Sequence, residues 1–218
     1  MAEETIETID LYTEFEKLRE QVVRDECCPD WKVAKTFEHT TIYKGTIDHS
    51  HHVVYKFVSK LGGIPVEDAV KLVTDIPLRL RYDRAFSEIK VLEDHGDYKT
   101  IYWYIPLPSL VSDRDLVQHV KVLTDEPTRT TYVVALPATH PGAPEKPRVI
   151  RAETRISVSI LRPDEDDPAS SVITTITHTD LKGLLPDFVI NHGVMKTGDD
   201  WRMSMTTFYH DVYLKEKQ

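Results

Sequence analysis

The stretch Leu181-Lys182-Gly183-Leu184-Leu185-Pro186-Asp187-Phe188-Val189-Ile190-Asn191 decides how this chain folds at its C-terminal end. A β-like run stops at Asp180, and Gly183 offers a turn. Pro186 then opens a helix, because its missing N–H has no partner to lose in the first turn and its φ is already helical. After Pro186, side chains of one helix face recur every three or four residues, at Ile190, Val194, Thr197, Trp201, Met205, Phe208 and Val212. This spacing predicts a long amphipathic helix.

Upstream of this stretch the sequence pattern changes to the period of two that is typical of strands. Runs rich in Val, Ile, Thr, Tyr and Phe, separated by turn residues, predict nine strands. We expect them at 31–38, 40–48, 51–60, 86–94, 97–106, 114–124, 129–138, 148–161 and 171–179. A sheet of so many twisted strands curls rather than staying flat, so we expect it to curve around the C-terminal helix.

Two further helices complete the expected fold. Leu11, Phe15, Leu18 and Val22 form an apolar stripe that predicts a helix over about 4–24. Residues 66–73 predict a short helix after the third strand, acidic in its first turn and stopped by Asp75-Ile76-Pro77. The sequence therefore predicts an α+β fold, a curved antiparallel sheet of about nine strands with a long terminal helix, as one domain over 1–218.

Charge and composition restrict the partners. The 218 residues carry 27 basic and 36 acidic side chains, a net charge of −9, which opposes broad contact with a nucleic-acid backbone. The acidic start Met1-Ala2-Glu3-Glu4 lacks the pattern of a secretory signal, and no run is apolar enough to span a membrane. Adjacent Cys27 and Cys28 cannot form an unstrained disulfide. We expect a soluble, cytoplasmic monomer that does not bind nucleic acid.

One cluster of the sequence could suggest a metal site. It is His49-Ser50-His51-His52. His51 and His52 would point to opposite faces of a strand, and only Asp48 adds a carboxylate nearby, so a polar turn is favoured. We expect neither a metal nor a cofactor.

Six short motifs resemble, by their order and spacing, the START domain, a lipid-binding family related to steroidogenic acute regulatory protein. They are Arg79-Leu80-Arg81-Tyr82-Asp83, Glu88-Ile89-Lys90-Val91-Leu92, Pro106-Leu107-Pro108, Ser112-Asp113-Arg114-Asp115-Leu116-Val117, Val149-Ile150-Arg151 and the segment 180–186. The resemblance covers nearly the whole chain. It implies the helix-grip fold, in which a nine-stranded sheet grips the C-terminal helix over a lipid-sized tunnel.

The resemblance also implies residues for the lipid head group, most closely as in the phosphatidylcholine-transfer branch of the family. Arg79 and Asp83 fall on positions that face the head group there, and they would support each other if helical. The Arg79 fork suits a phosphodiester, although an internal ion pair alone is the alternative. Trp103 falls on one wall of an aromatic cage for choline, but Leu116 and Arg155 replace its two tyrosines. This departure favours an anionic or smaller head group.

The orientation of two charged residues stays open. Period two places Arg155 with Ser157, opposite Ala152 and Val158; the resemblance favours the Arg155 face as the cavity wall, and hydrophobic patterning favours the other. Glu88 matches an acidic cavity position of the sterol-binding branch, but Val120 stands where its arginine partner would be. Glu88 then needs another partner, such as Arg114 or His119, or contact with water.

The predicted function is that of a carrier that binds one lipid, phospholipid-like, and transfers it between membranes without chemistry. Trp201, Met205 and Phe208 would roof the tunnel, or instead seal a packed core. A gate would let the lipid pass during transient contact with a membrane surface, formed by Leu107, Leu110, Val111, Leu185, Phe188 and Val189. A sterol carrier and a lipid-sensing module are the alternatives, and a cyclase or hydrolase of related fold is the least favoured.

Overall fold

The computed structural model describes residues 2–24, 28, 30–46, 53–108, 111–183 and 187–217, except for the side chains of 2–10 and 187–197. The helices are α1 (Ala2–Val23), α2 (Val66–Thr74), α3 (Ile76–Tyr82), α4 (Asp187–Phe208) and α5 (Leu214–Glu216), with one π-helical turn, Tyr209–Tyr213, between the last two. The strands are β1 (Lys32–Thr36), β2 (Thr40–Thr46), β3 (Val53–Leu61), β4 (Glu88–Asp94), β5 (Lys99–Ile105), β6 (Asp113–Asp125), β7 (Thr130–Pro137), β8 (Val149–Arg151), β9 (Glu153–Pro163) and β10 (Ser171–Asp180).

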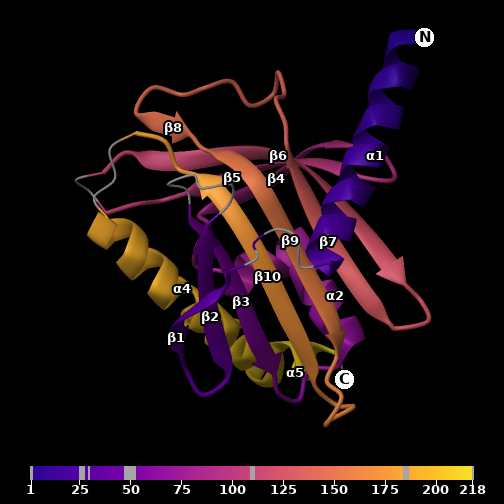
Figure 1. Ribbon diagram of the computed structural model, residues 1–218, viewed down its shortest axis with the longest axis vertical. Helices are drawn as coiled ribbons and strands as arrows, with labels where there is room; N and C mark the ends of the chain where they lie inside the picture. The colour runs from indigo at the N-terminus through magenta and orange to yellow at the C-terminus, as the bar shows by residue number, and fades with distance from the viewer. Residues whose placement is uncertain are drawn as a thin grey trace.

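The strands form one curved sheet in the order β1-β2-β3-β10-β9-β7-β6-β5-β4, and every neighbouring pair along this path is antiparallel (Figure 1). The predicted α+β, helix-grip architecture is confirmed. One expected strand is divided: the run 148–161 becomes β8, which pairs in parallel with β6, and β9, which pairs with β7 and β10. The chain changes partner at Ala152, whose N–H donates to the Asp115 carbonyl (2.9 Å).

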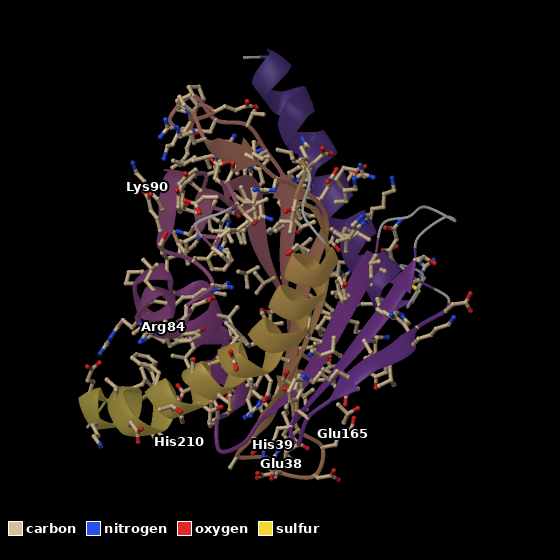
Figure 2. The ribbon with its side chains drawn as sticks, turned by 90° about the vertical axis from the view of Figure 1, so that its left-hand side faces the viewer. Glu38, His39, Arg84, Lys90, Glu165 and His210 are labelled. Atoms are coloured by element: carbon tan, nitrogen blue, oxygen red, sulfur yellow. The ribbon has the colours of Figure 1, made fainter. Side chains whose placement is uncertain are left out.

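The two faces of the sheet are covered by different helices, as Figures 1 and 2 show. Val134, Val158 and Ile176 pack against Phe15 and the neighbouring apolar residues of α1 on what we call the outer face. Leu161 and Ile173 each lie three residues from one of these and so point to the inner face, where they contact α2 and α4. α4 therefore crosses the face opposite to α1.

Asp75 both ends α2 and begins α3. Its carboxylate accepts the N–H of Leu78 (3.1 Å), which caps the first turn of α3, and Pro77 stands within that turn. The short helix stops where expected, but a second helix follows at once. This helix brings Arg79 and Asp83 one turn apart.

The π-helical turn and the segment 214–217, which follow α4, are bonded to α2 and α3. Asp68 accepts hydrogen bonds from the Tyr209 hydroxyl and the Lys217 ammonium, both at 2.7 Å. Burial alone would raise the pKa of Asp68, but these two donors outweigh it and hold the pKa below its usual value. Arg81 also bonds Glu216 through two nitrogens, each at 2.7 Å. Across the described residues, no helix is long and apolar enough to cross a membrane.

Candidate functional site

Arg79 of α3 and Asp83, which caps the C-terminal end of this helix, form a partly buried ion pair. The Arg79 Nε donates to the Asp83 Oδ2 at 2.9 Å, and the Asp83 side chain is 1% exposed. The same Oδ2 accepts the indole N–H of Trp201 from α4 (3.1 Å), and Oδ1 accepts the backbone N–H of Ala85 (3.1 Å). Three donors thus engage Asp83, which orients Arg79 and ties α3 to α4.

The guanidinium of Arg79 lies over two aromatic rings. Its Cζ is 5.0 Å from the centroid of Trp103 and 5.6 Å from that of Phe86, and the two rings lie 5.0 Å apart. This is a cation–π arrangement in which Arg79 supplies the cation. The ring of Trp103, on which the resemblance places choline, therefore already interacts with a cation of this protein.

Trp103 carries a polar group that has no partner within the described part of the chain. The residue is 7% exposed, and its indole N–H donates no hydrogen bond to any described residue. A buried donor without an acceptor costs about 1–3 kcal/mol, so such groups are rare in native structures. The second terminal nitrogen of Arg79, Nη2, likewise donates to no described residue, and Nη1 reaches only the Val73 carbonyl at 3.5 Å. We call Arg79, Asp83, Phe86, Trp103 and Trp201 the arginine–tryptophan site.

An apolar wall on the inner face adjoins this site. Leu116 lies directly across from Trp103 on β6, and both pack with Ile89, Ile101 and Ala152. Val120 is partly buried against the same cluster. The structure therefore brings the predicted residues Trp103, Leu116 and Val120 together.

Met205 and Phe208 lie elsewhere. Both are buried in the core between the sheet and α2, where Phe208 stacks on Tyr82 with ring centroids 5.7 Å apart. The sequence left open whether these residues roof a tunnel or seal a packed core. In the structure both lie in a packed core. Trp201 alone among the three predicted roof residues reaches the arginine–tryptophan site.

Glu88 and Arg155 are not brought to this site. Glu88 is exposed and lies across from Tyr104, because its neighbour Ile89 takes the inner face. A register shift in the β9–β10 pairing falls at Arg155, whose side chain is 44% exposed and lies 3.8 Å from Asp180. The sequence left open whether the Arg155 face or the aliphatic face of the 148–161 run lines the inner side. Neither face does so along the whole run, since Ala152 packs on the inner face and Val158 on the outer one.

The predicted gate is described only in part. Leu107 and Val111 are partly buried. Leu110 and Leu185 lie outside the described residues, as do the side chains of Phe188 and Val189. Asp113 holds the base of the loop, accepting the Tyr104 hydroxyl (2.6 Å) and the Leu107 N–H (2.8 Å). These bonds lower the pKa of Asp113, and the bond to Asp113 raises the pKa of Tyr104 to about 12.

A row of hydroxyl groups on the inner face was missed by the sequence reasoning. Ser157 and Ser159 of β9 and Thr175 and Thr177 of β10 stay partly exposed although their strands lie in the middle of the sheet. Ser159 and Thr175 bond each other at 3.1 Å. The sequence could have indicated this row, because the hydroxyl residues alternate with Ile156, Val158 and Ile176, which lie on the opposite face. These hydroxyls could bond ester or hydroxyl oxygens of a ligand.

The histidine cluster 49–52 lies outside the described residues. Among those described, no three His, Cys, Asp or Glu side chains gather closely enough to hold a metal ion.

Comparison with known proteins agrees with this architecture. Residues 20–210 match the model of the START domain. Steroidogenic acute regulatory protein of Danio rerio is 30% identical over 120 residues, which are 53% of this chain and 41% of that protein. The chain thus matches less than half the length of such curated relatives.

Solved structures show the same fold. Human StAR-related lipid transfer protein 5 superposes with a TM-score of 0.82 at 18% identity, covering 93% of this chain and 97% of that one. Human STARD10 superposes with a TM-score of 0.75 at 18% identity, covering 91% of this chain and 81% of that one. Since the family model spans most of the sequence, this chain belongs to the START domain family.

Proposed function

We propose that this protein binds one lipid between the inner face of the sheet and α4 and carries it, as a monomer, between membranes in the cytoplasm without altering it chemically. Membership of the START family supports this proposal, as do the lipid-transfer name of one structural neighbour and the apolar wall beside Trp103. The observation that carries it is the buried N–H of Trp103, which finds no acceptor among the described residues although its ring lies beside the Arg79 guanidinium. A lipid head group would supply the missing acceptor.

The chemistry of the arginine–tryptophan site favours a phosphate that carries no cation. Arg79 and Trp103 offer donors, whereas both oxygens of Asp83 already accept hydrogen bonds. A quaternary ammonium would meet the cation of Arg79 where it needs an aromatic face. A phosphomonoester or phosphodiester would accept charge-assisted bonds from both donors. A phospholipid with a small anionic head group is therefore the proposed cargo.

Both acyl chains would lie against the apolar wall. Each methylene removed from water contributes about 0.8 kcal/mol, so spontaneous release into water would be very slow. Exchange would then take place in contact with a bilayer. This is the reason for including a transient membrane surface among the partners.

Transfer between vesicles tests the proposal. Donor vesicles would contain fluorescent phosphatidic acid or fluorescent phosphatidylcholine, and native mass spectrometry would identify any lipid already bound. We expect faster transfer of phosphatidic acid, and Arg79→Gln should reduce it about tenfold or more, since bonds to charged groups contribute about 1.5–3 kcal/mol.

Arg84→Gln provides the matched control. Arg84 follows α3 closely, is exposed and points away from the body of the protein in Figure 2. This variant should transfer lipid at the wild-type rate. A wild-type protein that neither contains lipid nor transfers either probe would refute the proposal, and equal transfer by the Arg79 variant would refute the head-group assignment.

A further inference from the structure

Arg114 is a fully buried cation that no carboxylate neutralises among the described residues. It is the first residue of β6 whose side chain lies on the inner face. It is 1% exposed and is the largest of the fully buried side chains among the described residues. Its Nε donates to the Leu181 carbonyl (2.6 Å), its Nη2 to the Lys182 carbonyl (2.9 Å) and its Nη1 to the Ser112 carbonyl. Burial lowers the pKa of Arg114, and the charge of Asp113 opposes this effect only in part.

The three carbonyls belong to two segments that are far apart in the sequence. Ser112 ends the loop between β5 and β6, and Leu181 and Lys182 begin the turn between β10 and α4. In Figure 1 the end of β10 and the start of β6 lie at the same end of the sheet. One guanidinium therefore joins the loop at the mouth of the proposed lipid site to the turn from which α4 departs.

The turn is shaped to present its carbonyls to Arg114. Lys182 has a φ of 48° and Gly183 a φ of 71°, both in the left-handed region. The Asp180 carboxylate accepts the Lys182 N–H at 2.9 Å and so stabilises this conformation. A side chain at position 183 would lie 3.6 Å from the Arg114 Nη2 and 3.2 Å from Ile150.

Separation of the two segments would cost more than the loss of ordinary contacts. Hydrogen bonds from a guanidinium are roughly twice as strong as neutral ones. If the turn moved away, Arg114 would lose two of its three acceptors while still buried, and an uncompensated buried charge is strongly unfavourable. The three bonds therefore favour one closed arrangement and have to be broken together.

We propose that Arg114 is a positioning residue for lipid exchange, a latch that holds Ser112, next to the start of β6, against Leu181 and Lys182, which follow β10, and limits the rate at which these two places separate. This inference rests on the proposed function in assuming that lipid passes between these segments. It assigns Arg114 to the rate of exchange and leaves head-group preference to the arginine–tryptophan site.

Arg114→Lys tests the latch because it keeps the charge but cannot reach three acceptors at once. We expect amide hydrogen exchange across the peptide 178–190 to accelerate about tenfold or more, and release of bound fluorescent phosphatidic acid to acceptor vesicles to accelerate as well. The preference for phosphatidic acid over phosphatidylcholine should stay unchanged.

Arg151→Lys is the matched control. Arg151 is a partly buried arginine near this end of the sheet, and its hydrogen bonds go to Asp115 (2.7 and 3.1 Å) and the Ala143 carbonyl, not to Ser112, Leu181 or Lys182. This variant should be less stable overall without selective acceleration of exchange in the 178–190 peptide.

A second variant keeps the latch testable if Arg114→Lys does not fold. Asp180→Ala removes the cap of the turn while leaving Arg114 in place, and it should accelerate exchange in the same peptide. The combined variant should accelerate it by less than the product of the two single effects, since both changes weaken one contact.

The outcomes separate the two proposals. Wild-type exchange of the 178–190 peptide in both Arg114→Lys and Asp180→Ala would overturn the latch, whatever lipid the protein carries. Absence of lipid transfer by the wild type would refute the proposed function, and with it the role of the latch in lipid exchange.

Discussion

Trp103 combines two chemical properties that point in different directions. The face of its ring receives the guanidinium of Arg79 at 5.0 Å, and its buried N–H lacks an acceptor among the described residues. The first property is satisfied within the protein, whereas the second requires a ligand or costs stability. The two can be separated by substitution, because phenylalanine retains an aromatic face and has no N–H.

Trp103→Phe should weaken the binding of phosphatidic acid about tenfold, since a hydrogen bond to a charged group is worth about 1.5–3 kcal/mol and 1.4 kcal/mol corresponds to a factor of ten. Titration of the purified protein with the lipid in detergent would measure the change. Trp31→Phe, on a tryptophan that packs with the outer-face cluster, should leave binding unchanged. Equal affinities of the Trp103 variant and the wild type would contradict the assigned role.

For single residues, the sequence predicted the spacing of side chains along the chain better than the direction in which they point. The i, i+4 relation of Arg79 and Asp83 allowed their ion pair, and α3 forms it. The position of Arg79 over Trp103 could not be predicted, because it depends on how α3 packs against β5. The predicted face of Arg155 assumed that side chains alternate strictly between the two faces of the strand. A register shift at Arg155 interrupts this alternation.

Among the elements, α4 depends on a close approach to β3. Gly198 lies where this helix passes Phe57, and a Cβ at that position would come within 2.5 Å of the ring atom Cδ1. The glycine thus lets α4 lie close to the sheet. This contact also sets how far the helix stands from the inner face.

Gly198→Ala should therefore destabilise the protein. Alanine favours a helix by about 1 kcal/mol over glycine, but forcing a methyl group into a packed contact costs typically about 1–3 kcal/mol. We expect the melting temperature to fall by about 2–4 °C, as measured by circular dichroism. Gly62→Ala, where the added Cβ would have no neighbour within 4 Å, should not lower it. A more stable Gly198 variant would show that α4 has room above Phe57.

Most elements were predictable because their periodicity is strong. The β strands, α1, α2 and the terminal helix follow from periods of two and 3.6, and all are present. The division of the 148–161 run was not predictable, because the chain passes from pairing with β6 to pairing with β7 and β10 at Ala152 without any turn residue. α3 was missed because Pro77 looked like the end of one helix, whereas it belongs to the first turn of the next.

For the molecule as a whole, the two faces of the sheet differ in what they contact: both carry packed core, and the inner face also carries the candidate site. The outer face packs against α1 through Phe15, which is 1% exposed, together with Leu18 and Val22. The inner face carries Trp103, the hydroxyl row and the contacts with α4. Substitutions in the outer-face core should therefore change stability and leave ligand recognition unchanged.

Phe15→Ala should lower the free energy of unfolding by about 3–5 kcal/mol, because it empties a large buried site beneath α1. Urea unfolding would measure the loss. At a temperature where the variant remains folded, the ratio of phosphatidic acid to phosphatidylcholine transfer should equal that of the wild type. A changed ratio would mean that the two faces are coupled through the sheet.

The placement of the three tryptophans also gives the protein a built-in optical reporter. Trp103 and Trp201 both contact the charged pair of α3, so an anion arriving there would alter the electric field around two indoles at once. Trp31 packs with the outer-face cluster beneath the ammonium of Lys56, 4.3 Å away. Emission from the native chain therefore contains signals from two tryptophans at the arginine–tryptophan site and from one on the outer face. Binding of an unlabelled anion at that site should change the wavelength and intensity of the fluorescence.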